Sequence, residues 1–272
     1  VFLVIAVVIV QIGLAVTVLL AHQPASTCEN SLDQIVIISP GMSADAISEM
    51  LHELGVIRSA FVFNIMLRIT NTDSHLKAGE YLLNPTLSTM DVIKKLNEGD
   101  IVTYRITIPE GYELKQIAKE LAQAGLVDYD RFLLLASNAE LVFGENLPFD
   151  LPIDSLEGYL FPDTYYFAKE QSEEAIIRQM VARFVEQVIP NVDLSLLDYR
   201  FTLHEVVTLA SIVEKEVIYD FERPLVAAVY LNRLDINMRL QADPTVRYVM
   251  TENRSRVLYR DLEIDSPYNT YR

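Results

Sequence analysis

The sequence contains a single cysteine, Cys28, among 272 residues. One cysteine excludes an intrachain disulfide, so the fold depends on a hydrophobic core, for which a hydrophobic content of 51% is sufficient. Basic residues are also few, 22 against 38 acidic ones, and the formal net charge is −16. A chain this negative repels phosphate backbones, so we expect no nucleic-acid partner. The charge balance favours a neutral, polyol-like ligand held by hydrogen bonds.

Several catalytic and metal-binding patterns are missing as well. There is no His-x-x-x-His or Cys-x-x-Cys pair, no Gly-x-Ser-x-Gly nucleophile elbow and no glycine-rich phosphate loop. Ligand spacing is absent among the four histidines, which are His22, His52, His75 and His204. We therefore expect no metal site and no cofactor, and carboxylate chemistry is what remains.

Charge is absent from the N-terminal segment, residues 1–21, whose only polar side chains are Gln11 and Thr17. About 20 apolar residues span a bilayer as a helix, whereas the apolar part of a signal peptide has roughly 7–15 and ends in a small-x-small site. No convincing site of this kind lies between residues 21 and 26, so residues 1–21 are predicted to be a retained transmembrane anchor. A cleaved signal peptide is the alternative to this anchor. Cys28 is expected to be a bystander thiol rather than a lipidation site, because the preceding residues lack the usual leucine. The sequence lacks an initial Met and a basic flank, so we expect its start to be missing and orientation to follow from function.

Two segments resemble each other at an offset of about 70 residues, which suggests an internal repeat. Each is predicted to be a short β run, a turn at glycine and an amphipathic helix closed by a second glycine. Ser43 and Glu113 fall near the first turns of the two helices. Chance similarity of two βα units is the alternative. The aligned residues are Ile38, Gly41, Ile47, Leu51 and Gly55 with Ile108, Gly111, Ile117, Leu121 and Gly125.

The predicted fold class is α+β. Residues 33–138 are predicted to form a small α+β module, with a further strand around Gly79–Leu83 and a helix from Ser88 to Leu96. A connection rich in proline, asparagine and aspartate follows, and a mainly helical region occupies most of residues 140–272. The sequence stops at Arg272 without a terminating element, so we expect this region to be incomplete at its C-terminus.

A helix is predicted from near Thr202, because Thr202 is a suitable N-cap and Glu205 completes a capping box. At about 100° per residue, Glu216 projects about 20° from Leu209 and so lies inside the apolar arc of this helix. Glu214 falls roughly 140° away and outside the arc, where it can stay solvated.

A carboxyl group among apolar neighbours has a raised pKa, which is what a general acid requires near neutral pH. Glu216 is therefore a candidate acid. Alternatively, Glu216 marks the edge of the buried face and pairs with an arginine such as Arg223 or Arg233, and the helix geometry does not decide between these interpretations. Further along, Asn232 and Arg233 are either a ligand-facing pair or an ordinary polar face.

Six segments, in order, resemble the YceG-like family of endolytic murein transglycosylases. The segments cover nearly the whole chain; they are Lys77–Tyr81, Ile108–Gly111, Glu157–Tyr165, Ala210–Glu216, Leu231–Leu234 and Leu240–Val246. The resemblance implies a single-pass anchor in the inner membrane with the bulk of the chain outside the cytoplasm. It also implies that residues 33–138 are a LysM-like module and that residues 140–272 are the catalytic region.

The resemblance implies further that the catalytic glutamate lies in Glu214-Lys215-Glu216. We assign it to Glu216, in agreement with the helical face, and keep Glu214 as the alternative. The residues expected to bind substrate are Glu157, Asn232, Gln241, Asp243, Tyr268 and Asn269.

Lytic transglycosylases cut the β-1,4 bond between N-acetylmuramic acid and N-acetylglucosamine without water. The resemblance implies that this chain cuts nascent glycan strands in this way, leaves 1,6-anhydro ends and terminates elongation. Most glycosidases need two carboxylates, but here the nucleophile is the substrate's own 6-hydroxyl, so one carboxylate is sufficient. The expected partners are glycan strands, the membrane and peptidoglycan synthases. The alternative function is a non-catalytic, membrane-anchored scaffold that binds glycan.

Overall fold

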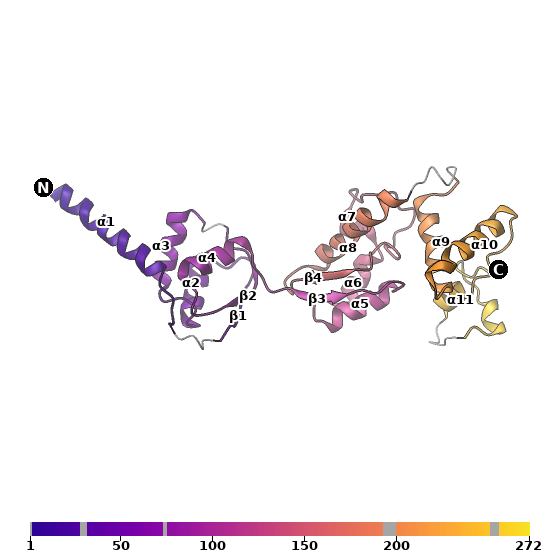
Figure 1. Ribbon diagram of the computed structural model, residues 1–272, viewed down its shortest axis with the longest axis horizontal. Helices are drawn as coiled ribbons and strands as arrows, with labels where there is room; N and C mark the ends of the chain where they lie inside the picture. Colours follow the sequence, from indigo (N-terminus) through magenta and orange to yellow (C-terminus); the bar gives the residue numbers. More distant parts are fainter. Residues whose placement is uncertain (1, 28–31, 73–74, 193–199, 251–255) are drawn as a thin grey trace. The chain divides into compact units, whose positions relative to one another are not determined.

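The computed structural model describes residues 2–27, 32–72, 75–192, 200–250 and 256–272, so the region around Cys28 lies outside the described residues. It confirms the predicted α+β class, with helices and two small sheets (Figure 1). The chain divides into two compact units. Unit 1 is Val1–Ile106 with Tyr165–Ser172, and unit 2 is Thr107–Thr164 with Glu173–Arg272. The boundaries predicted at residues 33–138 and 140–272 stay a prediction.

Unit 1 is a two-stranded antiparallel sheet covered on one face by helices. Its elements are α1 (Phe2–Ala21), β1 (Gln34–Ile38), α2 (Ala44–Glu53), α3 (Ala60–Thr70), β2 (Gly79–Leu83) and α4 (Thr89–Glu98). β1 pairs with β2 so that Val36 lies opposite Tyr81. Alternate strand residues such as Val36 and Tyr81 are buried under the helices, as a period of two requires. By length and composition, α1 is able to cross a membrane.

Two strands carry the chain between the units: β3 (Tyr104–Thr107) and β4 (Thr164–Phe167) pair with each other. Near them in unit 1, Glu80 has a buried carboxylate that accepts a hydrogen bond of 2.7 Å from the Tyr104 hydroxyl. Lys169 Nζ lies 3.6 Å from the same carboxylate and 4.6 Å from the centre of the Tyr104 ring. The buried charge of Glu80 is therefore paired.

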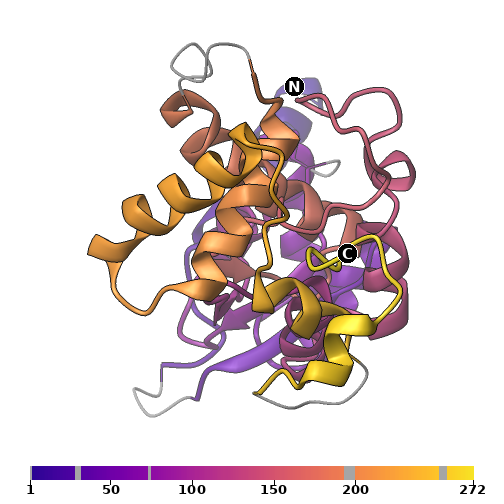
Figure 2. The same cartoon turned by 90° about the vertical axis from the view of Figure 1, so that its right-hand side faces the viewer.

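Unit 2 is mainly helical. Its elements are α5 (Leu114–Gln123), α6 (Tyr129–Ala136), α7 (Ala139–Phe143), α8 (Glu173–Gln187), η1 (Ile189–Asn191), α9 (Leu203–Glu216), η3 (Asp220–Glu222), α10 (Arg223–Asp235), α11 (Asp243–Val249) and η4 (Tyr259–Glu263). The predicted capping box of α9 is present, with Thr202 as N-cap and Glu205 completing it. α9 and α10 pack together and appear in orange in Figure 2.

The two segments of the predicted repeat have the same local structure. α2 and α5 each have ten residues and follow a strand and a turn. Gly55 and Gly125 come directly after the C-caps with φ of 70° and 69°, a left-handed conformation that glycine adopts without strain. The prediction of two matching βα units is confirmed: one consists of β1 and α2, and the other consists of β3 and α5.

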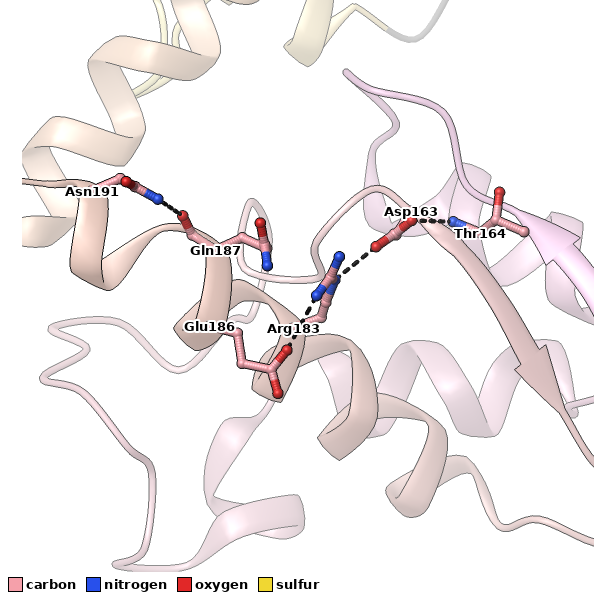
Figure 3. Close-up of polar contacts among 6 residues, drawn as sticks. All are labelled: Asp163, Thr164, Arg183, Glu186, Gln187 and Asn191. Atoms are coloured by element: carbon pink, nitrogen blue, oxygen red, sulfur yellow. Dashed lines mark hydrogen bonds and ion pairs between the residues drawn. The ribbon is translucent and has the colours of Figure 1, made fainter.

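Asp163 directly precedes β4 and is bound by Arg183 of α8 (Figure 3). Its carboxylate accepts hydrogen bonds of 2.7 Å from Arg183 Nε and from the Thr164 backbone N–H. Arg183 also contacts Glu186, 3.2 Å away, and its hydrogen bond lowers the pKa of Asp163. These bonds give Asp163 a structural role in joining α8 to the start of β4.

The last turn of the chain, residues 266–272, returns to α11. Thr270 accepts hydrogen bonds from the backbone N–H groups of Gln241 (3.1 Å, to the carbonyl) and Ala242 (2.9 Å, to Oγ1). The buried Asn269 amide donates to the carbonyls of Leu262 (3.0 Å) and Ile264 (2.8 Å). Asn269 Oδ1 accepts from the backbone of Tyr271. We name residues 266–272 the C-terminal turn.

We predict that Asn269→Ala destabilises unit 2, because it leaves the carbonyls of Leu262 and Ile264 without their donor at a cost of about 1–3 kcal/mol. Asn232→Ala is the matched control, since Asn232 is exposed, and it should change stability by about 0.5 kcal/mol or less. Urea unfolding of the two variants measures the difference. Equal unfolding midpoints would show that other contacts hold the C-terminal turn.

Candidate active site

Glu216 is the last residue of α9, and its side chain is exposed. Burial of Glu216 on the apolar face, predicted from helix periodicity, is therefore wrong. α9 is covered at Ile212 and Val213, which are 8% and 7% exposed, but the cover does not extend to its final residue. Glu216 thus has the access to a polymer that a buried carboxyl group would lack.

Glu214 is the more enclosed of the two glutamates, with 32% of its side chain exposed, and it is paired rather than solvated. Arg223 Nη2 lies 3.1 Å from Glu214, 3.4 Å from Asp220 and 3.5 Å from Glu110. The arginine pair considered for Glu216 is thus made by Glu214. Arg233, the other arginine considered, donates to the carbonyl of Leu240.

The Ile108–Gly111 segment lies against the end of α9. A Cβ on Gly111 would be 3.6 Å from Lys215 Nζ and 3.9 Å from Glu214 Cγ, so the backbone approaches both side chains closely. Together with the Glu110–Arg223 contact, this brings two of the motif segments into one place. The distances from such a Cβ are ordinary van der Waals distances, so a side chain at Gly111 would be strained by the φ of 75° rather than by its neighbours.

The charge of Glu216 acts on two tyrosines. Tyr230 is 4% exposed, and burial followed by the charge of Glu216 raises its pKa. Burial and a 2.6 Å hydrogen bond donated to Asp243 raise the pKa of Tyr271 to about 12, with a further contribution from Glu216. Both hydroxyls therefore stay protonated near neutral pH and remain hydrogen-bond donors beside a carboxylate.

A second carboxyl group of unit 2, that of Glu157, is partly buried. Glu157 Oε1 accepts from the backbone N–H of Leu114 (3.0 Å) and Oε2 accepts from the Tyr248 hydroxyl (3.3 Å). Desolvation raises the pKa of Glu157 and outweighs these hydrogen bonds, which lower it. The Tyr248 ring makes an edge contact with Tyr268, with 5.2 Å between centroids. Tyr268 is 57% exposed and presents an aromatic face to solvent.

The C-terminal turn contributes a residue to both sets of contacts. Tyr268 packs against Tyr248, which bonds to Glu157, and Tyr271 donates a hydrogen bond to Asp243. Gln241 belongs to the same assembly through its bond to Thr270, and its side chain is exposed. The backbone of Gln241 has a φ of 49°, a conformation that costs a residue with a side chain free energy and is frequent at functional sites.

Two other predicted substrate-binding residues, Asn232 and Asn269, have different environments. Asn232 lies exposed on α10. Asn269 is 4% exposed, and its amide shapes the C-terminal turn. Direct contact of either residue with substrate stays a prediction, and for Asn269 the contacts present are those of a positioning residue.

Tyr230, Tyr248 and Tyr271 are not among the residues that the sequence predicts for the site. The ring of Tyr230 is buried in the core around Ile212 and Val213, and the charge of Glu216 contributes to the raised pKa of its hydroxyl. Tyr248 follows the Leu240–Val246 segment by two residues, and its partner Glu157 is 91 positions away. The one available signal was the density of tyrosines near the C-terminus. Among the residues that the structure describes, no group of three or more His, Cys, Asp and Glu side chains is placed to hold a metal ion.

The raised pKa of Glu157 predicts a specific pH dependence of stability. A carboxyl group whose pKa is higher in the folded state than its ordinary 4.5 favours folding when protonated, and this contribution is lost as the pH rises through the folded pKa. Relative to Glu157→Gln, the unmodified chain should therefore lose stability as the pH rises above 4.5. Thermal unfolding across this range measures it.

Glu205 is the control, because hydrogen bonds from Thr202 lower its pKa. Relative to Glu205→Gln, the unmodified chain should instead lose stability as the pH falls through the lowered pKa. The same sign of pH dependence for both substitutions would contradict the assignment of Glu157 as a desolvated carboxyl group.

A curated protein named endolytic murein transglycosylase from Bacillus subtilis is 34% identical over 86% of this chain and 68% of its own length. A protein of the same name from Streptococcus pneumoniae is 31% identical over 86% of this chain, which spans 47% of that relative. A crystal structure of a YceG-like protein from Listeria monocytogenes is 36% identical, covers 89% of this chain and 82% of its own, and superposes with a TM-score of 0.55.

The model of the YceG-like family matches residues 36–272, which include the part of unit 1 that follows α1, all of unit 2, the end of α9 and the C-terminal turn. This confirms the resemblance inferred from the six segments. The chain belongs to the YceG-like family.

Proposed function

We propose that this chain is a lytic transglycosylase that cleaves murein glycan strands, with Glu216 as its acid and base. The observation that carries the proposal is the position of Glu216 within a family-matched segment: it is an exposed carboxylate on the last residue of α9, and its charge contributes to the raised pKa of Tyr230 and Tyr271. The names of the curated relatives support the reaction class.

In the proposed reaction Glu216 first protonates the glycosidic oxygen that leaves with N-acetylglucosamine. The 6-hydroxyl of N-acetylmuramic acid attacks its own anomeric carbon, and the Glu216 carboxylate takes the hydroxyl proton. One C–O bond breaks and one forms, no water is consumed, and the new end is a 1,6-anhydro sugar. A single carboxylate is enough because the proton that it gives is replaced within the same cycle.

In this mechanism the bound substrate shields Glu216 from water, because the side chain is exposed in the free protein. A bound strand would exclude water from Glu216, the condition in which a carboxyl group transfers protons efficiently to a leaving oxygen. Polar groups for holding the strand are available at Gln241, Asp243 and Tyr271, and Tyr268 offers a sugar an aromatic face beside Glu157. Asn232 and Asn269 remain proposed binding residues, with less support from their contacts.

For unit 1 we propose a LysM-like role in binding glycan. Its support is a compact α+β body with its own hydrophobic core and a paired, buried Glu80. A chain that only bound glycan would be a scaffold and would release no anhydro-ended products, so the assay below separates the two functions. The association with peptidoglycan synthases stays a prediction.

We predict that Glu216→Gln abolishes release of anhydro-muropeptides from purified glycan strands while the fold is kept. The amide preserves the size of the side chain but transfers no proton, and acid–base catalysis contributes about 10²–10⁴-fold to rate. Glu216 is exposed and forms no ion pair with the residues that the structure describes, so the variant should fold normally, which circular dichroism checks.

Glu214→Gln is the matched control on the same turn. It removes one of three carboxylates around Arg223 and leaves Asp220 and Glu110, so it should retain most activity. An inactive Glu214→Gln beside an active Glu216→Gln would transfer the catalytic role to Glu214. Full activity of both variants would rule out carboxylate catalysis by this helix.

We also propose that α1 anchors the chain in the inner membrane with both units outside the cytoplasm, because peptidoglycan lies on that side. The support is the apolar run Val4–Ala21, which has a mean hydropathy of 2.8. A reporter fused after Arg272 that is active only outside the cytoplasm should be active. Activity of a cytoplasm-only reporter at the same position would reverse the orientation and exclude this function.

A further inference from the structure

One face of α3 is apolar and exposed. Phe61, Ile65 and Ile69 are spaced by four residues and so share a face of the helix. Phe61 is 70% exposed, Ile69 is 47% exposed and Ile65 is half-buried. The opposite face, which includes Phe63 and Leu67, is buried in the core of unit 1, so α3 already has its packing partner and the apolar stripe is additional to it.

α3 packs against the end of α1 (Figure 1). Ala21 is fully buried in the core of unit 1, and Val18 packs against the same core. The following residues are also attached to unit 1: Arg58 donates a 2.8 Å hydrogen bond to Gln23, and Pro24 forms a bridge with Ser88. The anchor helix therefore continues directly into the folded body.

The membrane boundary on this side falls at the same place. The uncharged run ends at Ala21 and is followed by His22 and Gln23, whereas the side chains described from Phe2 to Val16 are exposed and mostly apolar. A bilayer that covers α1 must therefore end at the turn that packs on unit 1. The elements in contact with this turn, α3 among them, lie at the level of the lipid headgroups.

The charge of the residues around α3 also suits a position beside lipid headgroups. Residues 54–72 contain two arginines, Arg58 and Arg68, and no acidic residue, in a chain with a net charge of −16. Arg68 lies one residue before Ile69, on the exposed side of α3, and is itself exposed. Apolar side chains flanked by arginines are the composition that binds the boundary between headgroups and acyl chains.

We infer that the Phe61–Ile65–Ile69 face of α3 lies on the membrane surface beside α1, with Phe61 and Ile69 among the lipid headgroups and Arg68 near lipid phosphates. The inference rests on the proposed role of α1 as a membrane anchor and is independent of the catalytic assignment. It gives unit 1 a fixed orientation on the bilayer, in place of free rotation on a tether.

The test uses the full chain with Cys28→Ser and one new cysteine carrying an environment-sensitive fluorophore. The labelled positions are Ile69→Cys on α3 and, as matched control, Ile37→Cys on the sheet face that no helix covers; both isoleucines are 47% exposed. The protein is reconstituted in vesicles of phosphatidylcholine and phosphatidylglycerol. Nitroxide-labelled lipid and aqueous iodide are the two quenchers.

The fluorophore at position 69 should be quenched by nitroxide lipid and protected from iodide, and the one at position 37 should show the reverse. Equal iodide quenching at both positions, or equal lipid quenching at both, would overturn the inference. Extraction of the chain from vesicles by alkaline carbonate is measured in parallel. Release would refute the anchor and with it this inference, whereas the release of anhydro-muropeptides tests the catalytic proposal separately.

Discussion

Thr270 accepts hydrogen bonds from the backbone of Gln241 and Ala242, and these two bonds attach the C-terminal turn to the start of α11. The contacts that Tyr268 and Tyr271 make at the candidate site depend on this attachment. It places Tyr271 against Asp243 and near Glu216, and it places Tyr268 against Tyr248, which in turn bonds to Glu157. The bonds also hold Gln241 in its left-handed conformation, so one local connection sets the geometry of residues from four separate segments.

Three glutamates of unit 2 have environments that suit different tasks. Glu214 is paired with Arg223 and links α9 to α10, so its charge is compensated. Glu157 is desolvated and accepts two hydrogen bonds, which makes it a rigid element of the surface beside Tyr268. Glu216 is exposed at a helix end, and its charge contributes to the raised pKa of two tyrosines. A group that transfers protons to a polymer must be accessible to it, and of the three glutamates Glu216 is the exposed one.

At the other end of the chain, the end of α1, the proposed anchor, is part of unit 1. Ala21 is at once the last residue of the apolar helix and part of the core of unit 1. A short flexible connection would leave the orientation of unit 1 to diffusion, whereas shared packing restrains it. If α1 spans a membrane as proposed, this restraint limits the orientations that unit 1 adopts on the bilayer.

The sequence by itself determined the local elements, the candidate membrane helix, the two βα units and the family, because caps, glycine turns and apolar periodicity are properties of neighbouring residues. The capping box at Thr202 and the glycines after α2 and α5 are examples. The tertiary structure alone decided the environments of Glu214 and Glu216. A helical wheel assumes that burial continues along one face to the helix end, but Glu216, the final residue of α9, is exposed although Val213 is buried, and Arg223 of α10 pairs with Glu214. The contact between Glu157 and Tyr248 depends in the same way on packing between distant segments, which no local pattern encodes.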